Sequence, residues 1–509
     1  MPCFRSLAGV LTTLIATILL LPTSAKCDKG PKVHDPFFGI RVVDPATGNG
    51  VPLVQLKTTN EVTYWTDSDG WVAFAEPGLM GQEVYFQVAS PGYWLKPDGF
   101  GFRGVRLHPE AGASATIELP RYNVAERLCR LTGEGIYRDS ALLGLPLPAR
   151  MKNLNADVTG QDSVQVVPYQ GKLFWLWGDT NIASYPLGNF QTTCATSPLP
   201  VAGQPSPERG VPFEYFTRDD GRIRSMAPLA GDGPVWLFGL FNLAGDDGSE
   251  TLYAHFTRHK SLSEVVEHGV MKFDDEAGVF QKVANFDRNE LWRGPRGNAF
   301  MAKDKADQRN YIYFAAPFAY TRVAADEASI LDQHAYESFV FDRQEKKYVW
   351  RRDVPPTSQK EEQKLVEQGS IDPHTAARYR LQDAVSGKGV IMHGGSIAWN
   401  EHRQKWILIG NQAGDKDAPS YLGEVWYAEA DSPLGPWSSA VKIATHPQYS
   451  FYNPRQHPFF STNGGRVVYF EGTYTAMFSA AQSPTPRYDY NQLLYRLDLS
   501  DAKLKAAQK

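Results

Sequence analysis

Short runs of apolar residues separated by polar turns recur along almost the whole chain. From residue 36 to about residue 120, apolar and polar positions alternate in short strands, and the stretches PATGNG, DSDG and EPGLMG break them at intervals of about ten residues. Alternation with a period of two, punctuated by Gly, Asp and Pro turns, is typical of a small β-sandwich. We therefore expect residues 36–120 to form an N-terminal β-sandwich.

A second pattern begins near residue 155, where hairpins rich in Trp, Phe and Tyr recur and can be aligned on one another. Five such hairpins, each a small twisted sheet once its outer strands are added, predict a five-bladed β-propeller over residues 125–500. A single large β-sandwich or a β-helix fits the segment lengths less well. The five segments read SVQVVPYQGKLFWLWGDTN, RSMAPLAGDGPVWLFGLFN, GNAFMAKDKADQRNYIYFAAP, GGSIAWNEHRQKWILIGNQ and HPFFSTNGGRVVYFEGTY.

Two segments depart from the β pattern. Residues 355–380 carry helix-forming Lys, Glu, Gln and Leu between Pro and Gly breaks, so we expect a helical insertion between blades three and four. Within residues 1–25, Arg5 precedes an apolar run over residues 7–21. The small residues Thr23-Ser24-Ala25 follow that run, which is the pattern of a cleaved signal peptide. This predicts a secreted or periplasmic protein with no membrane contact after cleavage; an uncleaved N-terminal anchor is the alternative.

The composition narrows the partners. The chain has 52 Lys and Arg against 56 Asp and Glu, which offers no basic surface for nucleic acid and none for an anionic membrane. The partner is therefore expected to be uncharged or only locally charged. Oligomeric state is left open by the sequence.

Two aspartates mark the first hairpin of the predicted propeller. In a blade, the start of the innermost strand and the end of the next strand lie on the same face, so Asp162 and Asp179 should meet at one mouth of the central channel. The same rule applied to the other blades brings Glu471 to this mouth as a third acid. It also brings a set of polar and basic residues expected to bind substrate, namely Arg224, Arg296, Asn298, His393, Asn411, Arg455 and His457.

Acids, cations and aromatic walls around one opening favour a carbohydrate site, because sugars offer hydroxyl groups to charged partners and apolar faces to rings. Hydrolysis of a glycosidic bond with inversion needs one ionised carboxylate to activate water and one protonated carboxyl to protonate the leaving oxygen. The apolar neighbours of Glu471 suit the acid, and the polar neighbours of Asp162 suit the base. Asp179 would then orient water or tune the acid.

Structural roles compete with each of these assignments. Asp179 precedes Thr180 and could cap a turn, and Glu471 could form a structural ion pair with Arg455 or Arg296. The histidines could be satisfied core residues, and the arginines could brace the channel.

Two resemblances extend these predictions. VVDPATGNGVPLV and TDSDGWVAF resemble carboxypeptidase-regulatory or transthyretin-like domains, which are usually accessory. WYAEADSPLGPW resembles the A-x-S-P-x-G-P-W phrase of five-bladed-propeller glycoside hydrolases, the arabinanase and β-fructosidase group. GQD followed by GKLFWLWGDT is similar to the paired aspartate motifs of the uncharacterised-domain propellers that include endo-D-arabinanases, in which the two aspartates are the inferred catalytic pair.

These resemblances imply that Asp162 and Asp179 are catalytic, whereas Glu471 rests on the alignment of the hairpins alone. Gln161 replaces the Thr of the first motif, which leaves the substrate class open. No metal-binding or cofactor-binding motif occurs in the sequence, so no cofactor is expected, although propellers of this group sometimes hold a structural calcium. The sequence thus predicts a secreted glycoside hydrolase that cleaves a polysaccharide or oligosaccharide. A non-catalytic carbohydrate-binding or surface interaction propeller is the alternative.

Overall fold

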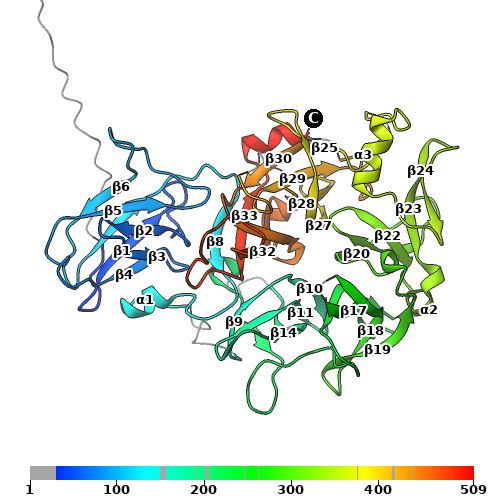
Figure 1. Cartoon of the computed structure of the whole chain (residues 1–509), viewed down its shortest axis with the longest axis horizontal. Coiled ribbons are helices and arrows are strands. Elements are labelled where there is room, and N and C mark those ends of the chain that lie inside the picture. The colour runs from blue at the N-terminus through cyan, green and yellow to red at the C-terminus, as the bar shows by residue number, and fades with distance from the viewer. Residues whose placement is uncertain are drawn as a thin grey trace, which may run out of the picture.

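The protein is described by a computed structural model, and it is an all-β protein, as predicted (Figure 1). The structure describes residues 30–508 apart from 149–155, 190, 201–205, 246, 262, 375, 415–418 and 438. The predicted signal sequence, residues 1–25, lies outside these residues. Among the described residues, none of the helices is long and apolar enough to cross a membrane.

The N-terminal domain is a β-sandwich of two sheets that lies beside the second domain (Figure 1). Alternate residues of both sheets, such as Ile40, Leu56 and Phe86, face inward and form one apolar core. One sheet has the order β4 (Trp71–Phe74), β1 (Phe38–Val43), β7 (Ser114–Glu118). The other has the order β3 (Thr63–Trp65), β2 (Gln55–Thr58), β5 (Val84–Ala89), β6 (Gly104–Leu107). Helix α1 (Arg138–Leu142) follows the sandwich and packs against β4.

The second domain is a five-bladed β-propeller. Blade 1 contains β10 (Gln165–Tyr169), β11 (Lys172–Trp177), β14 (Thr193–Pro198) and β15 (Glu214–Tyr215), and a small extra sheet of β13 (Tyr185–Asn189), β12 (Thr180–Ile182) and β9 (Val158–Gln161) extends it. Blade 2 contains β16 (Val235–Ala244), β17 (Glu250–Ser261), β18 (Glu264–Asp274) and β19 (Val279–Phe286). Blade 3 contains β20 (Asn298–Lys303), β21 (Asn310–Ala315), β22 (Ala319–Ala324), β23 (Glu337–Asp342) and β24 (Lys347–Arg352).

Blade 4 contains β27 (Met392–Asn400), β28 (Lys405–Gln412), β29 (Val425–Ala430) and β30 (Ser439–Ala444), with β25 (Leu381–Asp383) and β26 (Gly389–Val390) at its outer edge. Blade 5 contains β31 (Ser450–Gln456), β32 (Val467–Thr475), β33 (Asn491–Asp498) and β8 (Glu126–Arg130). Strand β8 precedes blade 1 in the chain but forms the outer strand of blade 5. Its antiparallel pairing with β33 therefore closes the ring (Figure 1).

The innermost strands of the five blades are β10, β16, β20, β27 and β31. Neighbouring members of this set pack against each other, as β10 does on β16 and β27 on β31. Each enters its blade from the same end of the propeller, and we call this end the front face. Residues near the starts of these five strands therefore come together, although they are far apart in the sequence.

Two predicted innermost strands were wrong. In blade 2, Met226 and Ala227 are buried but form no strand, and β16 is innermost. In blade 5 the innermost strand is β31 rather than HPFFST, which contains the single-turn helix Pro458–Phe460. Pro454 disfavours a strand in this segment, because proline cannot donate a ladder hydrogen bond. The strand accommodates it beside a bulge between Tyr452 and Arg455.

The helix α3 (Gln359–Glu367) lies within residues 355–380, between blades 3 and 4. Its Leu365 joins the apolar cluster of those blades, and its buried Glu362 accepts hydrogen bonds from Tyr348 Oη at 2.6 Å and from the backbone N–H of Tyr379 at 2.8 Å. The insertion is therefore packed into the propeller.

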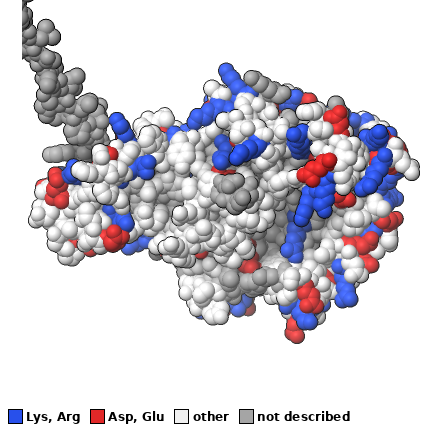
Figure 2. Space-filling view, turned by 45° about the horizontal axis from the view of Figure 1, so that its top comes forward, with Lys and Arg blue, Asp and Glu red and all other residues white. Residues whose placement is uncertain are grey.

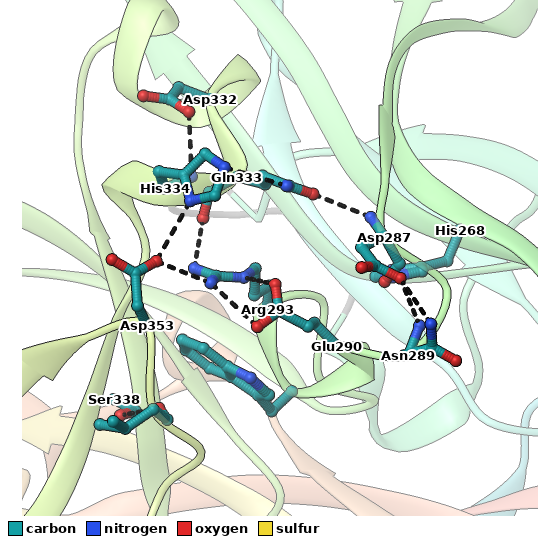
Figure 3. A network of polar contacts seen from close by, with 12 residues as sticks. His268, Asp287, Asn289, Glu290, Arg293, Asp332, Gln333, His334, Ser338 and Asp353 are labelled. Carbon is teal, nitrogen blue, oxygen red and sulfur yellow. Dashed lines mark hydrogen bonds and ion pairs between the residues drawn. The ribbon is translucent and has the colours of Figure 1, made fainter.

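A buried arginine joins blades 2 and 3 (Figure 3). Arg293, in the loop between them, is 1% exposed and donates to Glu290, to the carboxylate of Asp353 at 2.9 Å and to the backbone carbonyl of Gln333 at 2.7 Å. Its guanidinium also lies over the ring of Trp292, 4.4 Å from the centroid. These contacts use the arginine's donors within the structure, so we assign this network to blade packing.

Another buried arginine fixes the sandwich to the propeller. Arg127, on β8, donates two hydrogen bonds to the carbonyl of Pro52, at 3.1 and 2.9 Å, and one to the carbonyl of Pro91 at 3.0 Å. From blade 5, Tyr488 Oη accepts from the backbone N–H of Leu53 at 3.1 Å. The strand that closes the propeller therefore also carries the main polar contact to the N-terminal domain.

Replacing Arg127 with alanine should lower the free energy of unfolding by roughly 2–5 kcal/mol, because the buried carbonyls of Pro52 and Pro91 lose their donors. Chemical denaturation of the two proteins measures this change. Arg106→Ala is the control, since Arg106 is mostly exposed and contacts the exposed Glu83 and the ring of Tyr85. Equal stability of the two variants would contradict the anchoring role.

Candidate functional site

The two aspartates of blade 1 face each other across one antiparallel pair. The register that pairs Gln165 with Leu176 also pairs Gln161 with Thr180, and it places Asp162 directly opposite Asp179. One backbone hydrogen bond joins the two residues, from Asp162 N to Asp179 O at 3.3 Å, and Gly178 N donates to Asp162 O at 2.9 Å. Directly opposed residues have Cβ atoms about 4.5–5.5 Å apart, so the charge of each carboxylate acts on the other.

Gly178 leaves room for the first of these carboxylates. A Cβ atom at residue 178 would lie 2.3 Å from Oδ1 of Asp162, closer than non-bonded atoms approach. The carboxylate of Asp162 therefore lies directly over the backbone of the second strand. Glycine at this position is a steric requirement of the pair rather than a turn preference.

Asp162 turns toward blade 5. Tyr452 Oη donates to its Oδ2 at 2.6 Å, whereas its Oδ1 is buried and has no hydrogen-bond partner among the described residues. Burial raises the pKa of Asp162, and hydrogen bonds from Tyr452, Tyr490 and Ser163 oppose that rise because they stabilise the charged form.

Asp179 turns the other way, toward blade 2. Its Oδ1 accepts one hydrogen bond, from the indole Nε1 of Trp236 at 2.7 Å. Burial and the neighbouring charge of Asp162 raise the pKa of Asp179 to about 7, and the single bond from Trp236 opposes them only weakly. Of the two acids, Asp179 is thus the better placed to hold a proton, because the charge of Asp162 raises its pKa, whereas the hydrogen bonds to Asp162 favour the charged form of that group.

Blades 2 and 3 continue the site from Trp236. The imidazole of His259 packs against the indole with ring centroids 4.3 Å apart, and the guanidinium of Arg296 lies 3.0 Å from His259 Nε2. Burial lowers the pKa values of both His259 and Arg296. Arg296 itself remains exposed, just before the start of β20.

Blades 4 and 5 complete the front face. Asn453 donates to Ser163 Oγ at 2.8 Å, and its Oδ1 lies beside Gly394, which links the starts of β31, β10 and β27. His393 stands next to Gly394, and part of the residue is exposed. Desolvation of its ring lowers its pKa despite a hydrogen bond with Asn411. All five blades therefore contribute residues around Asp162 and Asp179.

Two predicted substrate-binding residues lie beneath this face and hold the backbone. Asn411 is fully buried and accepts from the backbone N–H of Gly394 at 3.1 Å. Asn298 is 8% exposed and donates to the carbonyl of Gly395 at 2.9 Å. Both residues position the start of β27, so their role is structural.

The structure contradicts the catalytic role predicted for Glu471. Its side chain is fully buried in the middle of β32, where Oε1 lies 2.7 Å from Nε2 of the equally buried His457. Arg455 pairs with it across the strand and donates to the carbonyl of Val166. The predicted substrate contacts of Arg455 and His457 are wrong for the same reason. The hairpin alignment placed Glu471 at a strand end, whereas β32 runs four residues further, to Thr475.

Arg224 is also outside the site. Its guanidinium donates to the carbonyl of Ala277 at 3.2 Å, in the turn between the outer strands β18 and β19. The prediction relied on an innermost strand at residues 224–229, and the structure has none there.

Several residues of the site were missed from the sequence, chiefly Tyr452, Tyr490, Asn453, Trp236 and His259. Trp236 stands one residue after the start of β16, and Tyr452 stands near the start of β31. The strand-start rule would have found both, had it been applied to the correct strands. The other half of the rule would have found His259, which lies two residues before the end of β17, the second strand of blade 2.

The described residues hold no cluster of three or more His, Cys, Asp or Glu side chains arranged for a metal ion. Acidic and basic side chains are intermixed over the propeller surface seen in Figure 2. The distinctive electrostatic feature of the site is therefore the aspartate pair and the arginine beyond Trp236.

Gly178→Ala should destabilise the fold by roughly 1–3 kcal/mol, because the new methyl group must displace the carboxylate of Asp162. Gly389→Ala is the matched control, since a Cβ atom there meets no atom within 4 Å. Thermal unfolding of the two variants compares them. Tolerance of alanine at residue 178 with the same melting temperature as the parent would argue against the close contact.

Glu471→Gln should lower the free energy of unfolding by about 3–5 kcal/mol, because the buried Arg455 loses its negative neighbour. Urea denaturation tests this, with the half-exposed Glu345→Gln as the control. A variant at residue 471 as stable as the parent would restore the case for a functional carboxylate there.

No protein-family model matches this chain, and no curated protein matches it. Among solved structures, the chain resembles an exo-β-1,3-galactanase from Phanerochaete chrysosporium with 13% identity and a TM-score of 0.35, covering 70% of this chain and 63% of that one. A putative exo-β-1,3-galactanase from Bifidobacterium bifidum has 12% identity and a TM-score of 0.33, covering 74% of this chain and 94% of that one. A GH43 β-xylosidase/α-arabinofuranosidase from a compost metagenome has 13% identity and a TM-score of 0.33, covering 64% and 89%. This chain thus spans less than two thirds of the Phanerochaete galactanase, and these distant similarities do not assign it to a family.

Proposed function

We propose that the protein is a secreted or periplasmic glycoside hydrolase that cleaves a polysaccharide or oligosaccharide with two carboxyl groups, Asp162 and Asp179. The observation that carries the proposal is the unequal environment of these two opposed aspartates. Glycoside hydrolysis needs one carboxylate and one carboxylic acid at the same pH. A close pair of carboxyl groups in unequal surroundings meets this need.

Asp162 is the base in this mechanism. Hydrogen bonds from Tyr452 and Tyr490 stabilise its ionised form, and its Oδ1 has no protein donor among the described residues. The carboxylate of Asp162 is the proposed acceptor for a proton from the attacking water. Tyr452 fixes its orientation through Oδ2.

Asp179 is the acid and takes the role that we had first given to Glu471. With its pKa raised to about 7 it is largely protonated in neutral and mildly acidic solution, and it can protonate the leaving oxygen. When it has given up its proton, the hydrogen bond from Trp236 stabilises the carboxylate that remains.

The two side chains diverge, Asp162 toward blade 5 and Asp179 toward blade 2. We propose that this divergence sets the carboxyl groups further apart than their Cβ atoms. An inverting enzyme requires about 6.5–9.5 Å between the two groups to admit water. We therefore propose inversion, which proton NMR of the first-formed anomer tests directly.

Asp162→Asn and Asp179→Asn should each reduce turnover of glycans by at least about 10²-fold, since general acid or base catalysis contributes this much. In the parent, kcat/KM should fall as pH rises through about 7, because Asp179 loses its proton there. Release of reducing sugar from a broad panel of polysaccharides measures both effects. Glu471→Gln, assayed well below its melting temperature, should keep its turnover.

Stability provides the control for folding. Because its pKa is raised, Asp179 holds a proton in the folded protein that the unfolded chain releases above about pH 4. The resulting loss of folding stability grows as pH rises from about 4 to about 7 and is fully present above pH 7. Asp179→Asn removes this penalty and should melt above the parent at pH 8. Glycan binding by a parent that releases no sugar from any member of the panel would favour a non-catalytic carbohydrate-binding propeller instead.

A further inference from the structure

We propose that the front face takes a glycan with an anionic substituent, the carboxylate of a uronic acid or a sulfate ester, and that Arg296 binds this group. The inference rests on the proposed hydrolase function and adds to it the charge class of the substrate. Its three supports are the position of Arg296, the way its charge is held and the lack of a carboxylate partner.

Arg296 stands at the front face by its place in the fold. It precedes β20, the innermost strand of blade 3, and the backbone around it is fixed, since the carbonyl of Gly297 accepts from Gln165 Nε2 at 3.2 Å and from Gly239 N at 3.0 Å. The side chain is nevertheless exposed. The fold thus holds the base of the side chain firmly and presents the guanidinium to the outside.

A neutral histidine orients the guanidinium. An arginine can only donate, so in this contact at 3.0 Å His259 Nε2 is the acceptor, and it also lies 2.8 Å from the hydroxyl group of Thr257. The proton of the imidazole is then on Nδ1, which lies 3.2 Å from the carbonyl of Ser261 and donates to it. Burial and the charge of Arg296 both lower the pKa of His259, which keeps this tautomer neutral.

The charge of Arg296 is not used within the protein. Across the described residues, no carboxylate forms an ion pair with it, and its one side-chain hydrogen bond is with neutral His259. Arg293 and Arg322 differ from it, since each of them contacts two carboxylates. An exposed guanidinium with one neutral partner keeps most of its five donors for a ligand.

The distance from the aspartates fits a neighbouring sugar. The indole of Trp236 and the imidazole of His259 stand between Asp179 and Arg296, and Arg296 is not among the groups that shift the pKa of Asp179. A glycan cleaved between the aspartates would therefore bring a substituent of an adjoining sugar to Arg296. The flat fork of the guanidinium matches a carboxylate or a sulfate group through paired hydrogen bonds.

Binding of matched glycan pairs tests the proposal. The probes are oligogalacturonates and their methyl esters, and carrageenan oligosaccharides and their desulfated forms, because the members of each pair differ mainly in charge. Calorimetric titration uses the full chain carrying Asp179→Asn, which removes turnover. We expect an anionic member to bind about 10–100-fold more tightly than its neutral counterpart, with an affinity that falls as salt is added.

Variants identify the residue responsible. Arg296→Gln should remove the preference for the charged member, and Arg296→Lys should recover only part of it because lysine keeps the charge but not the fork. Arg224→Gln is the matched control, since that arginine contacts a backbone carbonyl at the outer strands of the same propeller. A preference for uronates or for sulfated sugars names the source of the anion.

The proposal is overturned if neutral members bind as tightly as charged ones, if no anionic member binds, or if Arg296→Gln weakens both members of a pair equally. Turnover by the parent separates this outcome from the proposed function. Hydrolysis of neutral glycans that is unaffected by Arg296→Gln would leave the hydrolase standing and refute the anion site. Tight, Arg296-dependent binding without turnover would support the anion site and refute the hydrolase.

Discussion

The pairing of β8 with β33 is the constraint on which the arrangement of the propeller depends. A row of five sheets has two free edges, and it can bring its first and last blades together only if the two ends of the chain are joined. Strand β8 comes before blade 1 and completes blade 5, so the backbone ladder itself makes this junction. Tyr452 of blade 5 can then reach Asp162 of blade 1, residues that are 290 positions apart in the sequence.

The ring explains why two chemically identical side chains behave differently. Asp162 and Asp179 begin as equivalent partners of one hairpin, and both are removed from water. Closure brings Tyr452 and Tyr490 of blade 5 within hydrogen-bonding distance of Asp162. Among the described residues, the side chain of Asp179 accepts its hydrogen bond from the indole of Trp236 in blade 2. More hydrogen bonds to the charged form on one side decide which of the two carries the proton. The asymmetry is therefore a property of the assembled blades and not of the hairpin.

The sequence predicted the sandwich, the number of blades and the opposition of Asp162 and Asp179, because hydrophobic periodicity and hairpin geometry are local. The prediction failed where a buried segment is not a strand or where a strand contains a residue that disfavours strands. Met226 is buried without being in a strand, and β31 is a strand despite Pro454, so the rule that strand starts line the face was applied at the wrong residues in two blades. For that reason the prediction missed Trp236 and Tyr452, and it wrongly assigned Arg224 and Arg455 to the site.

Depth along a strand is the other quantity that sequence does not contain. Glu471 and Thr473 point to the same side of β32, and Thr473 accepts a hydrogen bond from the backbone of Ser163 beside the aspartates. Glu471 is thus on the correct side of the correct strand but one step too deep, where Trp175, Phe459 and Phe460 surround His457 and exclude water. A displacement of two residues separates a carboxyl group that could serve chemistry from one that balances Arg455. The apolar neighbours that made Glu471 look like a tuned acid are the same ones that bury it.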